Sequence, residues 1–306
     1  MRILITGGHG FIGSHISQRL LSLGQDELFT PSSKELDLVS EDKVDAYINK
    51  VKPDVIINCA NKGGDRGSEK TSVIEENLRI FFNLAKYAPN VKKIINLGSG
   101  AEYAKHKPIV DVSESDAYTS LPLDEYGLYK SLVSKYIEKS DNIYNLRIFG
   151  AYGENENYRF KFITNAIVKN LLKLPIVINK NVYFDYIYID DLIKIIEYFI
   201  FNDVKEKVFN ATTGKKIDLI TLAKHVNENS EFKSEIKVLN EGLNNEYSSS
   251  NEKLLTEMKD LVFMSHQDAI KKIRCHFREH MDTLDKESII NDPYLKKIDT
   301  MWKKDT

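Results

Sequence analysis

The fold is decided by an apolar run, Arg2–Thr6 (RILIT), and the glycine-rich stretch Gly7-Gly8-His9-Gly10-Phe11-Ile12-Gly13 that follows it. The run predicts a buried strand, and apolar residues three to four apart after the glycines predict a helix. Gly7 permits a turn with a positive φ, Gly10 leaves room for a pyrophosphate, and Gly13 lets the helix pack closely on the sheet. This context predicts a dinucleotide site, the alternative being a glycine turn without a ligand.

Strand-like and helix-like segments alternate over the first 150 residues. Further strands are predicted at 27–30, 54–58, 93–97 and 143–149. Helices are predicted at 11–23, 41–50, 71–87 and 123–140. This alternation predicts an α/β fold of Rossmann type, with a doubly wound parallel sheet and helices on both faces.

The later part of the chain has a looser pattern and predicts a smaller C-terminal α/β substrate lobe. Its expected elements are helices at 158–172 and 189–201, strands at 175–178 and 183–187, and short alternating pieces at 208–211, 219–225 and 237–239. We expect a dinucleotide-binding domain over 1–153 with returning elements within about 179–211, a lobe over 154–282 and a tail over 283–306. The charged stretch from Lys271, interrupted by Pro293, is expected to be solvated.

Composition excludes several classes of protein. The 306 residues carry a formal net charge of −2, whereas nucleic-acid binding depends on basic charge. No apolar run approaches the roughly 18 residues of a membrane span, and no leader-like segment precedes the first strand. Cys59 and Cys275 form no disulfide framework, and His276 and His280 lack an evident third metal ligand. We expect a cytoplasmic protein with no metal and no nucleic-acid or membrane partner.

The tip of the second strand bears on which dinucleotide binds. An NAD site usually has an acidic side chain about 20 residues after the glycines. Here Ser32, Ser33 and Lys34 stand at that point, and two hydroxyls with an ammonium suit a 2′-phosphate. The sequence therefore favours NADP(H), with NAD as the alternative because Glu35 follows directly.

Tyr126 and Lys130 are four residues apart in a predicted helix and so share one face. A free phenol has a pKa near 10, and a neighbouring ammonium favours its phenolate and lowers that pKa. Such a phenol can give a proton to the alkoxide that forms during carbonyl reduction. Ser99 follows the fourth strand, at the carboxyl edge where ligands of such sheets bind, and its hydroxyl is placed to polarise a substrate carbonyl.

These elements, in this order, resemble the extended short-chain dehydrogenase/reductase family, which acts mostly on nucleotide-sugars. The resemblance also rests on Leu36-Asp37-Leu38, Asn58-Cys59-Ala60-Asn61, Asn77, Arg147-Ile148-Phe149-Gly150-Ala151-Tyr152-Gly153 and Phe184-Asp185-Tyr186-Ile187-Tyr188-Ile189-Asp190-Asp191. It implies a catalytic set of Ser99, Tyr126 and Lys130, and often a dimer through a four-helix bundle that includes the Tyr126 helix. The cofactor contacts it implies, together with the glycine loop and Ser32–Lys34, are Asp37, Leu38, Cys59, Ala60, Asn61, Asn77, Leu97, Phe149 and Tyr152.

Departures from the family patterns narrow the expected chemistry. The 4,6-dehydratases have Thr-Asp-Glu where this chain has Ser99-Gly100-Ala101, and Glu102 is one position away. The GDP-fucose synthases resemble this chain through Leu97-Gly98-Ser99 and Ala60-Asn61-Lys62-Gly63-Gly64, but Ala101 and Arg159 replace their epimerase cysteine and histidine. Phe184 stands where an arginine often contacts the nucleotide. The expected substrate contacts are Lys62, Glu102, Tyr103, Arg159, Lys161 and Tyr183.

The leading hypothesis is an NADPH-dependent reductase of a 4-keto nucleotide-linked sugar or deoxysugar, serving surface-polysaccharide biosynthesis. The alternative is an NAD-retaining nucleotide-sugar 4-epimerase, which uses the same three catalytic residues. A third hypothesis is a dinucleotide-sensing regulator. Such relatives commonly lose the tyrosine or the lysine, and this chain keeps both.

Overall fold

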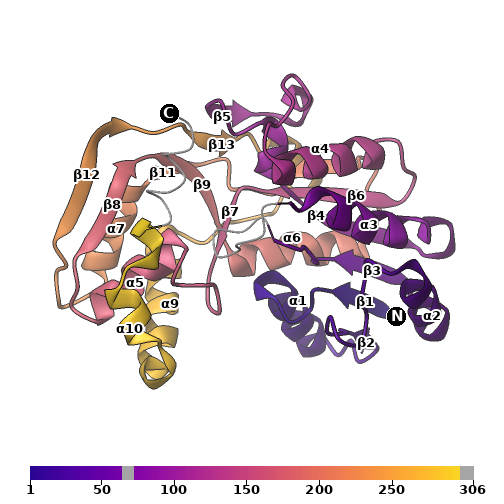
Figure 1. Ribbon diagram of the computed structural model, residues 1–306, viewed down its shortest axis with the longest axis horizontal. Helices are drawn as coiled ribbons and strands as arrows, with labels where there is room; N and C mark the ends of the chain where they lie inside the picture. Colours follow the sequence, from indigo (N-terminus) through magenta and orange to yellow (C-terminus); the bar gives the residue numbers. More distant parts are fainter. Residues whose placement is uncertain (64–71, 297–306) are drawn as a thin grey trace.

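Six parallel strands form the sheet that carries the glycine loop (Figure 1). The computed structural model describes residues 1–63 and 72–296. In sheet order the strands are β10 (Val208–Asn210), β6 (Ile143–Ile148), β4 (Lys93–Ser99), β3 (Val55–Asn58), β1 (Ile3–Thr6) and β2 (Leu28–Phe29). The predicted parallel sheet is confirmed. Gly64, Thr71 and the tail from 297 lie outside the described residues.

Helices cover both faces of this sheet, as the alternating pattern predicts. On one face lie α1 (Phe11–Ser22) and α6 (Ile189–Phe201), and on the other lie α2 (Glu41–Val51), α3 (Ile74–Ala85) and α4 (Glu125–Ile137). Successive side chains of a strand point to opposite faces. In β1, Ile3 and Ile5 therefore pack in the core under α1 and α6, whereas Leu4 packs under the other three helices. The Rossmann-type fold is confirmed.

A second part of the molecule, on the left in Figure 1, is built on two smaller sheets. The five-stranded one contains β5 (Ile109–Val112), β7 (Gly150–Tyr152), β9 (Tyr183–Tyr188), β11 (Lys216–Asp218) and β13 (Tyr247–Ser249), and the other pairs β8 (Ile176–Asn181) with β12 (Ile236–Leu243). The helices that follow are α5 (Phe162–Leu171), α7 (Leu219–Glu228), α8 (Glu252–Glu257), α9 (His266–Glu279) and α10 (Lys286–Ile290).

The chain passes between the two parts more than once. Within 179–211, α6 packs against α1 and β4, and β10 pairs with β6 of the large sheet. In the same range β9 belongs to the five-stranded sheet, where it pairs with β7, β11 and β13. The domain limits themselves stay a prediction.

Two expectations for the later part are wrong. The alternating piece at 219–225 is the start of helix α7, because Leu219, Leu222 and Ala223 fall on one buried helical face and Asp218 caps the first turn. The segment from Lys271 is not simply solvated, because Ile273 and Phe277 of α9 are buried against α5 and α7.

Within 1–63 and 72–296, every helix is too short or too polar to span a bilayer. The same ranges hold no group of three or more His, Cys, Asp or Glu side chains arranged to bind a metal ion.

Candidate active site

The turn between β1 and α1 has the close packing that the glycines predict. Gly7 has a φ of 68°, and a Cβ there would lie 2.8 Å from the carbonyl carbon of Cys59. A Cβ on Gly13 would lie 2.3 Å from the carbonyl oxygen of Gly7, so only glycine lets α1 approach the turn. The helix has no side-chain cap and no acidic residue in its first turn. Its first N–H groups and positive dipole end therefore suit a pyrophosphate, which fits a dinucleotide.

Ser99 ends β4 and begins a short 3₁₀ turn, Gly100–Tyr103. Its Oγ accepts a hydrogen bond from the N–H of Ala101 at 3.1 Å, and its own N–H donates to Glu102 Oε1 at 2.9 Å. The side chain is 8% exposed. The strand end and the turn together hold the hydroxyl at the carboxyl edge of the sheet.

Helix α4 brings Tyr126 and Lys130 to the same edge. Asp124 caps it by accepting a hydrogen bond from the N–H of Gly127 at 2.8 Å. A Cβ on Gly127 would lie 2.8 Å from the carbonyl oxygen of Ala101, so this glycine lets the first turn of α4 approach the turn after Ser99. The structure thus brings together the three residues predicted to be catalytic, from two elements that are distant in sequence.

The Lys130 ammonium is buried beneath the phenol of Tyr126. Its Nζ donates to the carbonyl oxygen of Leu97 at 2.6 Å and lies 5.9 Å from the centroid of the Tyr126 ring. Burial lowers the pKa of Lys130 to about 8, because the charged form loses hydration. The Tyr126 ring is half-buried and meets that of Tyr129 edge-on at 5.5 Å. An ammonium so placed favours a phenolate, as the helical spacing predicts.

Glu102 is not placed to contact a substrate. Its carboxylate is fully buried, and Arg147 Nε donates to it at 2.5 Å while Asn145 Nδ2 donates to both oxygens. Arg147 is also fully buried and donates to the hydroxyls of Tyr103 and Ser134. The carboxylate of Glu102 therefore pairs with a buried guanidinium in the core beneath Ser99.

Three other predicted contact residues have buried polar groups that are hydrogen-bonded to other protein groups. The Tyr103 hydroxyl donates to Asn210 Oδ1 at 2.8 Å. The Tyr152 ring is 1% exposed and its hydroxyl bonds His266 Nδ1 at 2.8 Å, so its side chain belongs to the core. Asn77, 3% exposed, bonds both backbone polar groups of Lys62 and holds the loop after β3. The polar groups of these side chains are therefore hydrogen-bonded within the protein, and their contact with a ligand stays a prediction.

The remaining predicted cofactor residues lie in the loops at the carboxyl edge or in the strand and helix ends beside them. Glu35 Oε2 accepts from the N–H of Ser32 at 2.8 Å, which folds the loop that contains Ser33 and Lys34. Asp37 Oδ1 accepts from the N–H of Val39. The others are Phe11 and Ile12 at the start of α1, Leu38 after β2, Cys59, Ala60 and Asn61 after β3, Leu97 in β4 and Phe149 after β6. Burial raises the pKa of the Cys59 thiol to about 12, so it stays protonated.

The predicted substrate residues of the second part are more scattered. Arg159 is exposed and its NH1 lies 3.4 Å from a carboxylate oxygen of Asp285. Lys161 is exposed at the start of α5. Tyr183 begins β9, with the Lys216 ammonium 5.6 Å from its ring centroid. Among the described residues, no hydrogen bond or ion pair joins these three to Ser99, Tyr126 or Lys130.

One residue of the site gives no signal in the sequence. Tyr247 lies in β13, about 120 residues along the chain from Tyr126, and a Cβ on Gly100, the residue after Ser99, would lie 2.5 Å from its hydroxyl oxygen. Its ring is half-buried, 4.8 Å from the Phe149 ring centroid. Strand β13 has three residues and no motif, so only the pairing of β13 with β5 and β9 reveals this placement.

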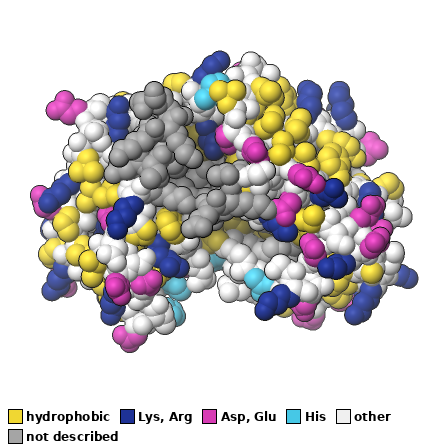
Figure 2. All heavy atoms as spheres, in the orientation of Figure 1, with side chains coloured by type: hydrophobic (Ala, Val, Ile, Leu, Met, Phe, Trp, Pro, Cys, Tyr) yellow, Lys and Arg dark blue, Asp and Glu magenta, His cyan; other side chains and the backbone are white. Residues whose placement is uncertain are grey.

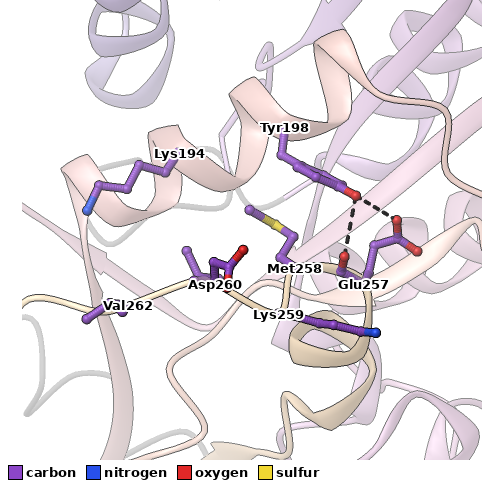
Figure 3. A pocket seen from close by; sticks show the side chains of 8 residues that line it. Lys194, Tyr198, Glu257, Met258, Lys259, Asp260 and Val262 are labelled. Carbon is purple, nitrogen blue, oxygen red and sulfur yellow. Dashed lines mark hydrogen bonds between the residues drawn. The ribbon is translucent and has the colours of Figure 1, made fainter.

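An open groove of about 680 Å³ lies elsewhere, between α6 and the loop after α8 (Figure 3). It is lined by Lys194, Tyr198, Glu257 and residues 258–262. The Tyr198 hydroxyl donates to a carboxylate oxygen of Glu257 at 2.9 Å. The groove contains none of the predicted site residues, so the candidate active site is the carboxyl edge of the large sheet.

The model of the NAD dependent epimerase/dehydratase family matches residues 3–212, which include the glycine loop, Ser99, Tyr126 and Lys130. The chain belongs to this family. The resemblance stated from the motifs is confirmed, and the match spans both the large sheet and β7 to β9 of the second part.

Curated relatives and solved structures agree with this assignment. The chain is 32% identical to a CDP-abequose synthase of Yersinia pseudotuberculosis over 225 residues, 66% of this chain and 74% of that protein. A GDP-mannoheptose C4 reductase of Campylobacter jejuni with NADP bound superposes with a TM-score of 0.80 at 20% identity, covering 90% of this chain and 98% of that one. A Thermus thermophilus UDP-glucose 4-epimerase with NAD superposes with a TM-score of 0.76 at 21% identity, covering 91% of this chain and 99% of that one. These two structures share the fold with this chain.

Proposed function

We propose that the chain is an NADPH-dependent reductase of the 4-keto group of a nucleotide-linked sugar or deoxysugar, in the biosynthesis of surface-polysaccharide sugars. The observation that carries the proposal is the surroundings of Ser99. The residue two positions along is the apolar Ala101, and the next carboxylate, Glu102, is paired with Arg147 in the core. Dehydration and epimerisation at carbons beside the ketone need an acid–base pair there, whereas a simple reduction needs only the serine, tyrosine and lysine.

The nicotinamide dinucleotide, when bound, supplies the hydride that adds to C4. Ser99 donates a hydrogen bond to the keto oxygen and stabilises the negative charge that develops on it. Tyr126 transfers its phenolic proton to that oxygen, so the ketone becomes a secondary alcohol. Lys130 holds its ammonium 5.9 Å from the Tyr126 ring centroid and favours the phenolate that remains.

The cofactor preference is proposed from the loop after β2. Ser32, Ser33 and Lys34 offer hydroxyls and an ammonium to a 2′-phosphate, and the last two side chains are exposed. Glu35 is the competing feature, since a carboxylate there suits the free ribose hydroxyls of NAD. It bonds the N–H of Ser32 instead, which lowers the pKa of Glu35 and keeps it ionised within the loop.

Isothermal titration of the purified chain with NADPH and with NADH tests this assignment. We expect NADPH to bind at least tenfold more tightly, a difference of about 1.4 kcal/mol. NAD that copurifies and does not exchange would instead favour the 4-epimerase, which keeps its cofactor through each turnover. A Tyr126→Phe variant that retained every biological activity would favour the sensing regulator.

The assembly is proposed to be a homodimer through α3 and α4. Phe82, Leu132 and Tyr136 are between 43% and 46% exposed on these helices, and hydrophobic side chains gather over α4 in Figure 2. An apolar face of this kind on two neighbouring helices suits a four-helix bundle. Light scattering on the wild type and Leu132→Asp should give a dimer and a monomer, and a monomeric wild type would contradict the proposal.

A further inference from the structure

A row of buried polar side chains crosses the large sheet just below its carboxyl edge. The register of the sheet aligns four of them on adjacent strands: Thr6 of β1, Asn58 of β3, Asn96 of β4 and Asn145 of β6. Two residues earlier in each strand, the same face carries an apolar side chain that packs under α2, α3 and α4. Buried polar groups cost free energy unless they are hydrogen-bonded, so the partners of this row show what it holds in place.

The row is a continuous chain of hydrogen bonds that run in one direction. Thr6 Oγ1 donates to Asn58 Oδ1 at 2.9 Å, and Asn58 Nδ2 donates to Asn96 Oδ1 at 2.9 Å. Asn96 Nδ2 donates to Asn145 Oδ1 at 2.7 Å, and Asn145 Nδ2 donates to both carboxylate oxygens of Glu102. Because a carboxylate only accepts, Glu102 fixes the orientation of each amide back to Thr6.

Both ends of this row reach the candidate active site. Thr6 is the last residue of β1 and directly precedes Gly7 of the glycine loop. At the other end, Glu102 Oε1 accepts a hydrogen bond from the N–H of Ser99 at 2.9 Å. A Cβ on Gly98 would lie 2.6 Å from the same oxygen, so this glycine leaves room for the carboxylate under the Ser99 turn.

The row also holds helix α4. Asn145 Nδ2 donates to Ser134 Oγ at 3.1 Å, and Arg147 Nη2 donates to the same oxygen at 2.8 Å. Ser134 lies one helical turn after Lys130 and two turns after Tyr126, on the same face of α4. One network therefore joins the glycine loop, the Ser99 turn and the helix that carries the tyrosine and the lysine.

We propose that this row is a positioning network for the reduction, with Asn96 at its centre as the positioning residue. Replacing the Asn96 amide removes the acceptor of Asn58 Nδ2 and the donor to Asn145 Oδ1, which divides the network between the glycine loop and the Ser99 turn. Reacting atoms must meet at about 3–3.5 Å, and a misplacement of about 1 Å can lower a rate about 10²-fold. The inference rests on the proposed function, which assigns these two turns to the dinucleotide and to the keto oxygen.

Asn96→Leu tests the inference, because leucine has a similar shape and no polar atoms. The probe is NADPH with whichever CDP-, GDP-, UDP- or dTDP-linked 4-keto sugar the wild type reduces. We expect the rate of NADPH oxidation in a single turnover to fall about tenfold, while the Kd for NADPH changes less than about twofold, since each turn stays folded and only their relative position is released. An unchanged single-turnover rate would overturn the inference.

Asn170→Leu is the matched control. It removes another buried amide, on α5, which donates to Ser234 Oγ at 3.0 Å and accepts from Arg274 at 2.6 Å. It should lower thermal stability by a similar amount and keep the single-turnover rate within about twofold. Equal rate losses in Asn170→Leu and Asn96→Leu would show that Asn96 acts only through stability.

Thr6→Val tests the row from the glycine-loop end and keeps the inference testable if Asn96→Leu does not fold. Valine has nearly the shape of threonine but cannot donate to Asn58, so the single-turnover rate should fall about threefold. Thr6→Ser keeps the hydroxyl and should restore most of that loss. In the Asn96→Leu background, Thr6→Val should have little further effect. Independent, multiplicative losses in the combined variant would contradict a single network.

Amide hydrogen exchange gives a readout without turnover. The Ser99 N–H is bonded within its own turn, and the Cys59 N–H donates to the carbonyl oxygen of Thr6 at 3.1 Å, so the two report on opposite ends of the row. Exchange at both should be at least about tenfold faster in Asn96→Leu than in Asn170→Leu. Equal rates in the two variants would refute the coupling. A wild type that reduces no keto-sugar would refute the proposed function, while these exchange rates would still decide the role of the row.

Discussion

A buried lysine side chain lies near each end of strand β4, and the two have different hydrogen-bond partners. At its first residue, Lys93 Nζ donates to the carbonyl oxygens of Phe199 and Asn202 and lies 3.6 Å from a carboxylate oxygen of Asp203. At the far end, Lys130 of α4 reaches one carbonyl oxygen of the strand, that of Leu97. Both residues are buried, with 6% and 8% of their surface exposed, and burial lowers the pKa of both side chains.

The difference separates a lysine bonded wholly within the protein from the lysine proposed to be catalytic. Lys93 has two carbonyl acceptors and a carboxylate, so its three N–H groups are used within the protein. Among the described residues Lys130 Nζ has one acceptor and no carboxylate partner, which leaves N–H groups for a ligand. An ammonium kept under-satisfied in this way costs stability, and it is found where chemistry needs the charge.

The largest effect on kcat should come from replacing each of these lysines by methionine in turn. Lys130→Met is expected to lower kcat at least about 10³-fold, because Tyr126 loses its neighbouring cation. Lys93→Met should leave kcat within about twofold and lower the free energy of unfolding by about 1–3 kcal/mol, since two carbonyls lose their donor. Steady-state kinetics and urea unfolding on both variants measure this. Equal losses of kcat in Lys130→Met and Lys93→Met would contradict the different roles given to the two lysines.

The carboxyl end of β4 also depends on the buried pair beneath it. Glu102→Gln leaves the Arg147 guanidinium without a counter-charge and should cost about 3–5 kcal/mol of unfolding free energy. The control is Glu197→Gln, which breaks the Arg19–Glu197 pair, whose side chains are 45% and 25% exposed. That change should cost less than about 1 kcal/mol. Comparable costs in chemical denaturation would contradict a structural role for Glu102.

The pH dependence of activity and stability tests the lowered pKa of Lys130. With a pKa of about 8, Lys130 loses its proton above that pH, and the rate of reduction should fall about tenfold per pH unit. The unfolded chain keeps the proton until about pH 10.4, so it binds more protons between these values, and stability should rise with pH in this window. Lys130→Met should make that rise smaller and leave the part due to Lys93, whose pKa burial also lowers. A flat wild-type stability curve would contradict the assignment.

The smallest effect concerns the cofactor end of the site. Lys34→Ala should weaken NADPH binding about tenfold and leave NADH unchanged, because only the 2′-phosphate loses a charge partner. Lys52→Ala, which removes an exposed lysine after α2, is the control and should change neither affinity. An equal loss of NADPH and NADH affinity in Lys34→Ala would show that the loop does not recognise the 2′-phosphate.

Local spacing made the large sheet predictable from sequence, together with the meeting of Ser99, Tyr126 and Lys130 at its carboxyl edge. The glycine loop and the Tyr126–Lys130 pair are short patterns. A regular turn fixes the backbone of the loop, and a regular helix places Tyr126 and Lys130 on one face. The Glu102–Arg147 pair joins residues 45 positions apart, and the Tyr247 hydroxyl lies against Gly100 from a distant strand. Nothing in a one-dimensional pattern marks those contacts.

The second part of the chain shows where periodicity misleads. Helix α9 packs against α5 and α7 through a buried stripe of Ala269, Ile270, Ile273 and Phe277. Charged residues alternate with this stripe along the sequence, so the sequence predicts that the segment is exposed to solvent. Tyr152 matches a family motif, yet its ring points into the core and bonds His266. A motif fixes where a residue lies along the chain, whereas packing decides which way its side chain points.

The most direct test of the central claim is the stoichiometry of cofactor use. Purified chain is mixed with NADPH and 4-keto nucleotide-sugars carrying CDP, GDP, UDP or dTDP, with Tyr126→Phe in parallel. The account predicts that, for at least one of them, one NADPH is oxidised for each ketone reduced, and that Tyr126→Phe loses this activity. Interconversion of nucleotide-sugars without net NADPH consumption would contradict the reductase and establish the epimerase.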